Sequence, residues 1–169
     1  MDWLETRGAL VAGTRRDLLG NALVLVGHGQ GLPPVDLEDL DLSQRLGEGR
    51  LAMALVDAVP AGIYGQAALR TLGKWEAVVP RIAQTDNVRA ALALVALGEA
   101  PLGIVYRTDA MADPRVSVLA TFPESAHPPI RYPVAALQDR PAVMAFLAYL
   151  SAPDARAVFT AHGFTALAE

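Results

Sequence analysis

Short apolar runs with the composition of buried strands alternate along this chain with segments of helical pattern. One such run is ALVLV at residues 22–26, a second of weaker β-propensity follows at residues 50–56, and GIVY at residues 103–106 is another strand. Strands separated by helices of about 10–15 residues are typical of an α/β fold whose strands are largely parallel. The sequence therefore predicts the α/β class.

Capping and helix-stopping residues define the remaining elements. Pro60 begins a predicted helix that Gly73 ends, and Asp86-Asn87 caps a second helix that Gly98 ends. The other expected elements are a helix at residues 74–82, strands at 116–120 and 132–137, and helices at 142–150 and 154–161.

Two segments rich in Gly and Pro divide the chain. Residues 27–37 (GHGQGLPPVDL) and 124–129 (ESAHPP) have the composition of linkers. They enclose a middle block of α/β character, whereas residues 1–19 and 140–169 outside it are expected to be helical. A middle lobe that interrupts an outer one is typical of hinged two-lobe proteins.

Composition and charge exclude several classes of function. The net charge is −4 and the basic residues are scattered, so general nucleic-acid binding is not expected. The absence of Cys excludes disulfides and thiolate metal sites, and His28, His127 and His162 show no ligand spacing. No apolar run reaches the ~20 residues of a membrane span. The acidic opening MDWLETRGAL lacks the basic region of a signal peptide.

Two helix starts carry the chemistry that the sequence offers. The first N–H groups of a helix have no partner within the helix and lie at the positive end of its dipole. Ala61 follows Pro60 in one opening turn, where small residues let an anion approach the backbone, and Val88 opens another helix. Tyr106 ends a strand and adds a hydroxyl. If these three residues converge, they form a neutral pocket of donors for a small oxyanion.

Each of these features also has an ordinary structural explanation. Pro is common at a helix start because its missing N–H would be unpaired anyway, and Asp-Asn is a common cap. A Tyr at a strand end is usually a half-buried packing residue. Arg89 would add positive potential near an anion, lie in solvent or pair with a carboxylate. The residue pattern alone leaves these interpretations open.

No catalytic motif accompanies the helix starts. No serine has a G-x-S-x-G context. The glycines of GHGQGL lack the G-x-G-x-x-G spacing, and Pro33-Pro34 follows them where a helix would begin. No nucleophile–base constellation supports an α/β enzyme, so an enzymatic function is not expected.

Several separated motifs resemble the molybdate-binding proteins of molybdate ABC transporters. They are TRRDLLGNALVLV, VPAGIYGQAAL, TDNVRAALALV, GEAPLGIVYRTDA, VLATFPESAHPPIRYPVA and SAPDARAVFTAHGF, in the family's order. The resemblance implies a type II periplasmic-binding-protein fold, with two α/β lobes joined by a two-strand hinge and an oxyanion in the cleft. The implied hinge strands are residues 22–26 and 132–137. The implied domains are residues 1–27 with 131–169, which hold the first lobe and the hinge strands, and residues 28–130, which form the second lobe.

The resemblance also implies the ligand residues. This family holds its tetrahedral oxyanion without salt bridges, through backbone N–H groups and hydroxyls. The matching positions are Ala61 of the VPAG turn, Val88 of NVR and Tyr106 of GIVY, the same three that the helix starts indicate. The implied ligand is molybdate or tungstate, with no cofactor, no cation ligands and no catalytic residues.

The implied partner is the membrane permease of an ABC transporter, and the implied location is the periplasm. The same fold also serves as the effector-sensing domain of transcription regulators, which is the alternative function. Those regulators carry a helix-turn-helix ahead of the lobes, and the residues before Trp3 could not form one.

The sequence departs from the family pattern in two ways. Leu55-Val56 stands where the family has Asp-Pro, and Ala58 stands where it often has His. Family members also begin with a segment that holds the first strand and helix of lobe one and two Ser ligands, whereas Met1 falls at an internal Met-Asp of the pattern. We therefore expect an incomplete first lobe, weak molybdate binding by this chain, and a homo-oligomer formed through exposed apolar surface.

Overall fold

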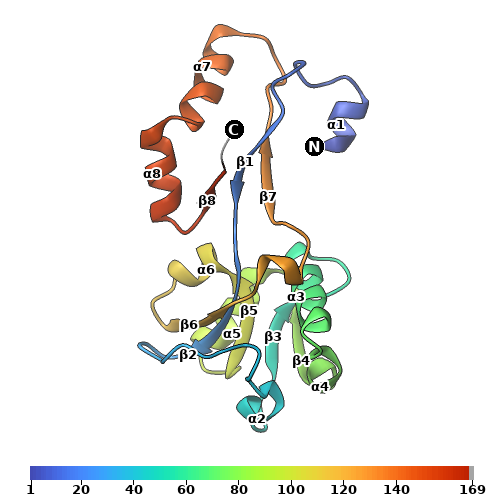
Figure 1. Ribbon diagram of the computed structural model, residues 1–169, viewed down its shortest axis with the longest axis vertical. Helices are drawn as coiled ribbons and strands as arrows, with labels where there is room; N and C mark the ends of the chain where they lie inside the picture. Colours follow the sequence, from blue (N-terminus) through green and yellow to red (C-terminus); the bar gives the residue numbers. More distant parts are fainter. Residues whose placement is uncertain (168–169) are drawn as a thin grey trace. The chain divides into compact units, whose positions relative to one another are not determined.

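The computed structural model describes residues 1–167, which divide into two compact units (Figure 1). Unit 1 comprises Met1–Asn21 and the chain from Ile130 onward, and unit 2 comprises Ala22–Pro129. The chain therefore passes between the units twice. The predicted boundary at residue 27 differs from this division, because residues 23–28 form a strand within the sheet of unit 2.

Unit 2 is built on a five-stranded sheet with the strand order β4-β3-β5-β2-β6. The strands are β2 (Leu23–His28), β3 (Leu51–Ala54), β4 (Ile82–Thr85), β5 (Leu102–Tyr106) and β6 (Val116–Thr121). β3 pairs in parallel with β4 and β5, whereas β2 pairs antiparallel with β5 and β6. Within residues 22–129, four strands thus share one direction, as predicted, and β2 alone runs against them.

Helices α3 (Pro60–Thr71) and α5 (Val88–Ala96) cover opposite faces of this sheet. A Cβ on Gly65 of α3 would lie 2.6 Å from the Met53 side chain, and a Cβ on Gly103 would lie 2.7 Å from Val95 of α5. Met53 and Gly103 belong to different faces because Gly103 is paired with Ala52, the neighbour of Met53. The centre of the sheet is therefore buried on both sides, which explains the continuous apolar runs of β2, β3 and β5.

The predicted helix at residues 74–82 is wrong in its second half. Residues Trp75–Val78 form the short helix α4 and Val79–Arg81 a single 3₁₀ turn, and the edge strand β4 then begins at Ile82. The sequence of β4, IAQT, is only half apolar, so it gave no strand signal of its own. The remaining short helices of unit 2 are α2 (Leu42–Leu46), α6 (Arg107–Met111) and the 3₁₀ turn Glu124–Ala126.

Unit 1 contains a three-stranded antiparallel sheet with the order β7-β1-β8. Its elements are α1 (Asp2–Thr6), β1 (Arg16–Gly20), β7 (Arg131–Val134), α7 (Pro141–Leu150), α8 (Pro153–Ala161) and β8 (Thr165–Ala166). The strand that pairs with β7 is β1, whereas the implied hinge strand at residues 22–26 belongs to the sheet of unit 2. The expectation of helix throughout residues 1–19 is also wrong, because residues 16–20 are extended.

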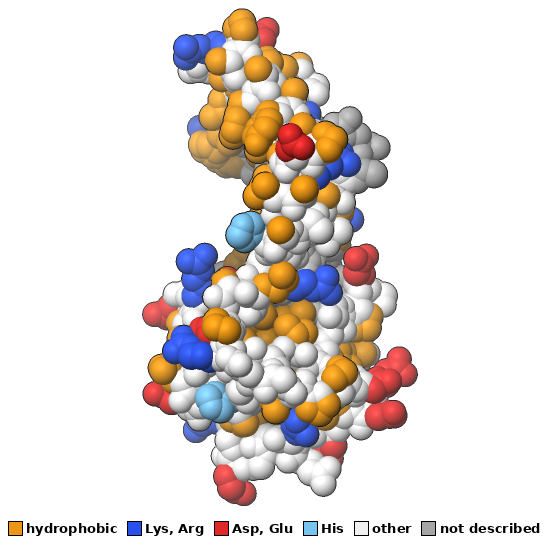
Figure 2. All heavy atoms as spheres, turned by 90° about the vertical axis from the view of Figure 1, so that its left-hand side faces the viewer, with side chains coloured by type: hydrophobic (Ala, Val, Ile, Leu, Met, Phe, Trp, Pro, Cys, Tyr) orange, Lys and Arg blue, Asp and Glu red, His pale blue; other side chains and the backbone are white. Residues whose placement is uncertain are grey.

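Hydrophobic side chains gather on the outer surface of α7 and α8 (Figure 2). The sequence of α7, PAVMAFLAYL, is apolar all round, yet Leu147 is its only buried residue in the described chain. No single helix in residues 1–167 is long and apolar enough to cross a membrane; α7 and α8 reach that length only together, with a 55° bend between them.

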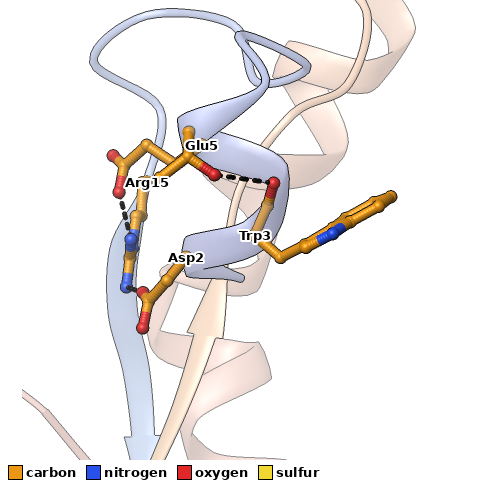
Figure 3. A network of polar contacts seen from close by, with 5 residues as sticks. Asp2, Trp3, Glu5 and Arg15 are labelled. Carbon is orange, nitrogen blue, oxygen red and sulfur yellow. Dashed lines mark hydrogen bonds and ion pairs between the residues drawn. The ribbon is translucent and has the colours of Figure 1, made fainter.

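Charged contacts hold the N-terminal helix α1 close to β1 (Figure 3). The guanidinium of Arg15 donates hydrogen bonds to the carboxylates of Asp2 and Glu5. The hydrogen bond from Arg15 lowers the pKa of Asp2. Because these groups lie at the surface, the pairs add little to the free energy of unfolding.

Candidate functional site

The carboxyl ends of β4, β3 and β5 meet at one edge of the unit 2 sheet, because these three neighbours are parallel. α5, α3 and α6, which follow these strands, all begin at this edge. β3 and β4 are neighbours in the sheet, but the helices that follow them, α3 and α5, cover opposite faces of that sheet. In open α/β sheets, such a divergence at the carboxyl ends of neighbouring strands is where ligands bind.

The first turn of α3 is pressed against the end of β3. A Cβ on Gly62 would lie 2.3 Å from the carbonyl oxygen of Leu55 and 2.4 Å from that of Ala54, so only glycine fits here. The helical ladder begins with the bond from the Ile63 N–H to the Val59 carbonyl, at 2.9 Å. The N–H of Ala61 precedes that bond and belongs to the orphan donors of the helix end.

The first turn of α5 is defined by its cap. The backbone of Asn87 is extended, and its side-chain oxygen accepts a hydrogen bond from the Ala90 N–H at 2.9 Å. This bond satisfies one donor of the first turn and leaves the Val88 N–H, at the first helical position, outside the ladder. The Val88 side chain is half-buried against the apolar core, which fixes the orientation of its backbone.

Tyr106 is the last residue of β5 and immediately precedes α6. Its side chain is half-buried. In the first turn of α6, the carboxylate of Asp109 lies 3.6 Å from the guanidinium of Arg89, which belongs to the first turn of α5. This contact shows that the openings of α5 and α6 are neighbours.

Arg89 and Asp109 form an ion pair between the openings of α5 and α6. Two of the alternatives for Arg89 hold together, because its guanidinium is paired with a carboxylate and is also exposed to solvent. Burial raises the pKa of Asp109, and the attraction of Arg89 opposes that effect. Arg89 itself is 86% exposed, so the edge of the sheet carries no buried, unpaired cation among these residues.

The structure therefore brings Ala61, Val88 and Tyr106 to one edge of one unit. Two of them open helices on opposite faces of the sheet, and the third ends the neighbouring strand. The two helix openings offer backbone N–H donors outside the helical ladder, which suit a ligand that carries negative charge on acceptor oxygens. Their role as ligand residues stays a prediction.

Sequence reasoning missed the polar residues that join these openings. The Val56 N–H donates to the side-chain oxygen of Gln84 at 3.0 Å, and the hydroxyl of Thr85 lies 2.9 Å from the Asn87 carbonyl oxygen. The available signal was the run of polar residues from Gln84 to Asn87 directly before a helix. It gave no indication of which backbone groups these side chains would bind.

Two hollows of unit 2 lie away from these three residues. One hollow of about 590 Å³ lies beside β6 and another of about 570 Å³ lies at the opposite edge of the sheet, around Gly49 and Pro101, and neither is lined by Ala61, Val88 or Tyr106. Residues 1–167 contain no group of three or more His, Asp or Glu side chains that could hold a metal ion.

Comparison with known proteins gives a consistent result. The family described as bacterial extracellular solute-binding protein matches residues 1–165. The molybdate-binding protein ModA of Escherichia coli (strain K12) is 43% identical over an alignment of 169 positions, which covers 98% of this chain and 66% of that protein. The chain thus spans just under two thirds of the length of this relative.

Solved structures confirm the predicted fold class. The substrate-binding domain of a putative molybdenum ABC transporter from Clostridium difficile superposes with a TM-score of 0.82 at 24% identity, covering 99% of this chain and 73% of that one. The periplasmic molybdate-binding protein of Azotobacter vinelandii gives 0.77 at 23% identity, covering 99% and 74%. At these identities, the superpositions establish a shared fold.

Proposed function

Because this chain belongs to the bacterial extracellular solute-binding proteins, we propose that it captures molybdate or tungstate for an ABC importer. The observation that carries the proposal is the meeting of two helix openings and Tyr106 at one sheet edge. The 43% identity to a molybdate-binding protein supports the choice of ligand. The proposed partner is the membrane permease of the importer, and the proposed location is the periplasm.

Recognition in this proposal is electrically neutral. The N–H groups of Ala61 and Val88 and the hydroxyl of Tyr106 donate hydrogen bonds to the oxygens of the anion, and the positive ends of two helix dipoles face it. Hydrogen bonds to a charged acceptor are the stronger ones in proteins, so affinity does not require an Arg or Lys. The site binds and releases its ligand without a chemical step.

Donor-only recognition also separates similar anions. Molybdate and tungstate are large, fully deprotonated dianions with four acceptor oxygens. A phosphate that retains a proton brings a donor to a site made of donors and leaves one hydrogen bond unmade. Sulfate has the right charge but is smaller, so donors that are held apart by the sheet cannot all reach it.

The similarity to a molybdate-binding protein favours capture for transport over the alternative function, effector sensing for a transcription regulator.

The test is a thermal-unfolding titration of this chain with molybdate, tungstate, sulfate and phosphate at constant ionic strength, taken into the millimolar range. A ligand at ten times its dissociation constant stabilises the folded protein by about 1.4 kcal/mol. We expect molybdate and tungstate to raise Tm most and phosphate least. An equal response to all four anions, or to none, would contradict the proposal.

We further propose that a second copy of the chain covers the apolar surface of α7 and α8. Met144, Phe146, Tyr149 and Val158 are all exposed there, with Phe146 at 59%. Contiguous apolar patches of this kind mark interfaces, and identical chains pair most often through a two-fold contact.

The expected result is a mass by light scattering that rises toward a dimer with concentration. Phe146→Asp should shift the equilibrium to the monomer, because the new carboxylate would be desolvated in the interface. Leu97→Asp is the matched control, since Leu97 is 62% exposed but belongs to unit 2. A monomeric mass at every concentration would rule out this interface.

A further inference from the structure

The loop between β3 and α3 is held by the end of β4. The N–H of Leu55 donates to the carbonyl of Thr85 at 2.9 Å, which continues the parallel ladder by one bond. The next N–H, that of Val56, donates to the side-chain oxygen of Gln84 at 3.0 Å. A side chain of β4 thus accepts the hydrogen bond from the loop at the point where the backbone after Thr85 turns toward α5.

The same end of β4 also determines how α5 begins. The hydroxyl of Thr85 lies 2.9 Å from the carbonyl oxygen of Asn87 and 3.3 Å from that of Met53, which is in β3. Asn87 in turn caps α5 by accepting from the Ala90 N–H. Gln84, Thr85 and Asn87 therefore join the exit of β3, the exit of β4 and the first turn of α5.

We propose that Gln84 is a positioning residue that sets the spacing between the Ala61 and Val88 amides and so the size of anion the site prefers. This inference rests on the proposed function. The loop that Gln84 holds is the segment that leads into the first turn of α3, and Gln84 extends from the strand that leads into α5. The Gln84 side chain is exposed, so its removal disturbs no packed core.

The proposed role requires a side chain at position 84 that is long enough to accept from the Val56 N–H and that carries no charge. Alanine has no acceptor for the Val56 N–H. A glutamate has the same reach and accepts the same bond, but it adds a negative charge beside an anion site. That charge repels every dianion alike, and salt screens the repulsion. The two replacements therefore separate the loss of the hydrogen bond from the addition of charge.

The experiment compares wild type with Q84A, Q84E and the control Q30A, whose side chain is exposed in the loop after β2. Titrations with molybdate and sulfate give the ratio of the two affinities. Q84A should weaken molybdate binding about three- to tenfold, the worth of one hydrogen bond. It should also lower the molybdate-to-sulfate ratio, because a freed loop adapts to the smaller anion. Q84E should keep the ratio and lose affinity in a salt-dependent way, and Q30A should match wild type.

A second readout needs no ligand. Hydrogen exchange at the Val56 amide should be faster in Q84A than in wild type and close to wild type in Q84E. Unchanged exchange in Q84A would overturn the contact, and faster exchange with an unchanged affinity ratio would overturn the positioning role. If wild type binds none of the anions, the proposed function fails together with the claim on selectivity, and the exchange measurement decides the contact alone.

Discussion

Gly62→Ala is expected to destabilise the protein by about 2 kcal/mol and to abolish anion binding. The added Cβ would lie 2.3 Å from the Leu55 carbonyl oxygen and 2.4 Å from that of Ala54. Both atoms are backbone and cannot rotate away, so the first turn of α3 must lift from the end of β3. Overpacking costs up to about 3 kcal/mol, against a gain of about 1 kcal/mol in helix propensity. Urea unfolding monitored by circular dichroism measures the difference.

Gly65→Ala in the same helix is the matched control for this prediction. There the nearest atom to the added Cβ is the terminal methyl of Met53, at 2.6 Å, and a flexible side chain can yield. We expect a clearly smaller loss of stability and retained anion binding. If Gly62→Ala were as stable as wild type, the close contact between α3 and β3 would not exist in solution.

Val88→Pro is expected to weaken molybdate binding by about 10- to 100-fold, because it deletes one donor to a charged ligand. Proline is well tolerated at the first position of a helix, where its missing N–H breaks no helical bond. The preceding Asn87 has φ −159° and ψ 165°, the extended backbone that a residue before proline prefers. The change therefore removes the proposed ligand group and leaves the helix in place.

Val88→Ala separates the amide from the side chain. It removes the half-buried side-chain contacts but keeps the N–H, so we expect a modest loss of stability and near-normal affinity. Isothermal titration measures both variants against wild type. If the two variants lose affinity equally, the Val88 amide is not a ligand group, and the proposal for this helix opening is wrong.

The parts of the fold that the sequence predicted are those with local signals. The strand at residues 22–26 is a continuous apolar run, α3 begins at a proline and α5 at an asparagine cap, and each of these elements was placed within a residue or two. The two helix openings were predictable as candidate anion donors for the same reason: the backbone chemistry of a helix end depends on the turn that contains it.

What the sequence did not predict depends on distant partners. β4 is a strand because β3 offers it a ladder, and β1 is a strand because it pairs with residues more than a hundred positions away in β7. The opposed direction of β2 is likewise a property of the assembled sheet. At the site, the bond from Val56 to Gln84 joins residues 28 positions apart, so neither residue alone indicates it.

Because the chain passes between the units twice, unit 2 is an insertion within the chain of unit 1. Its first strand and its last strand are sheet neighbours, and the Phe122 N–H donates to the Leu23 carbonyl at 2.9 Å. On either side of the module, Gly20 and Arg131 are paired, so entry and exit lie side by side and the module can be replaced as one piece without stretching the host chain.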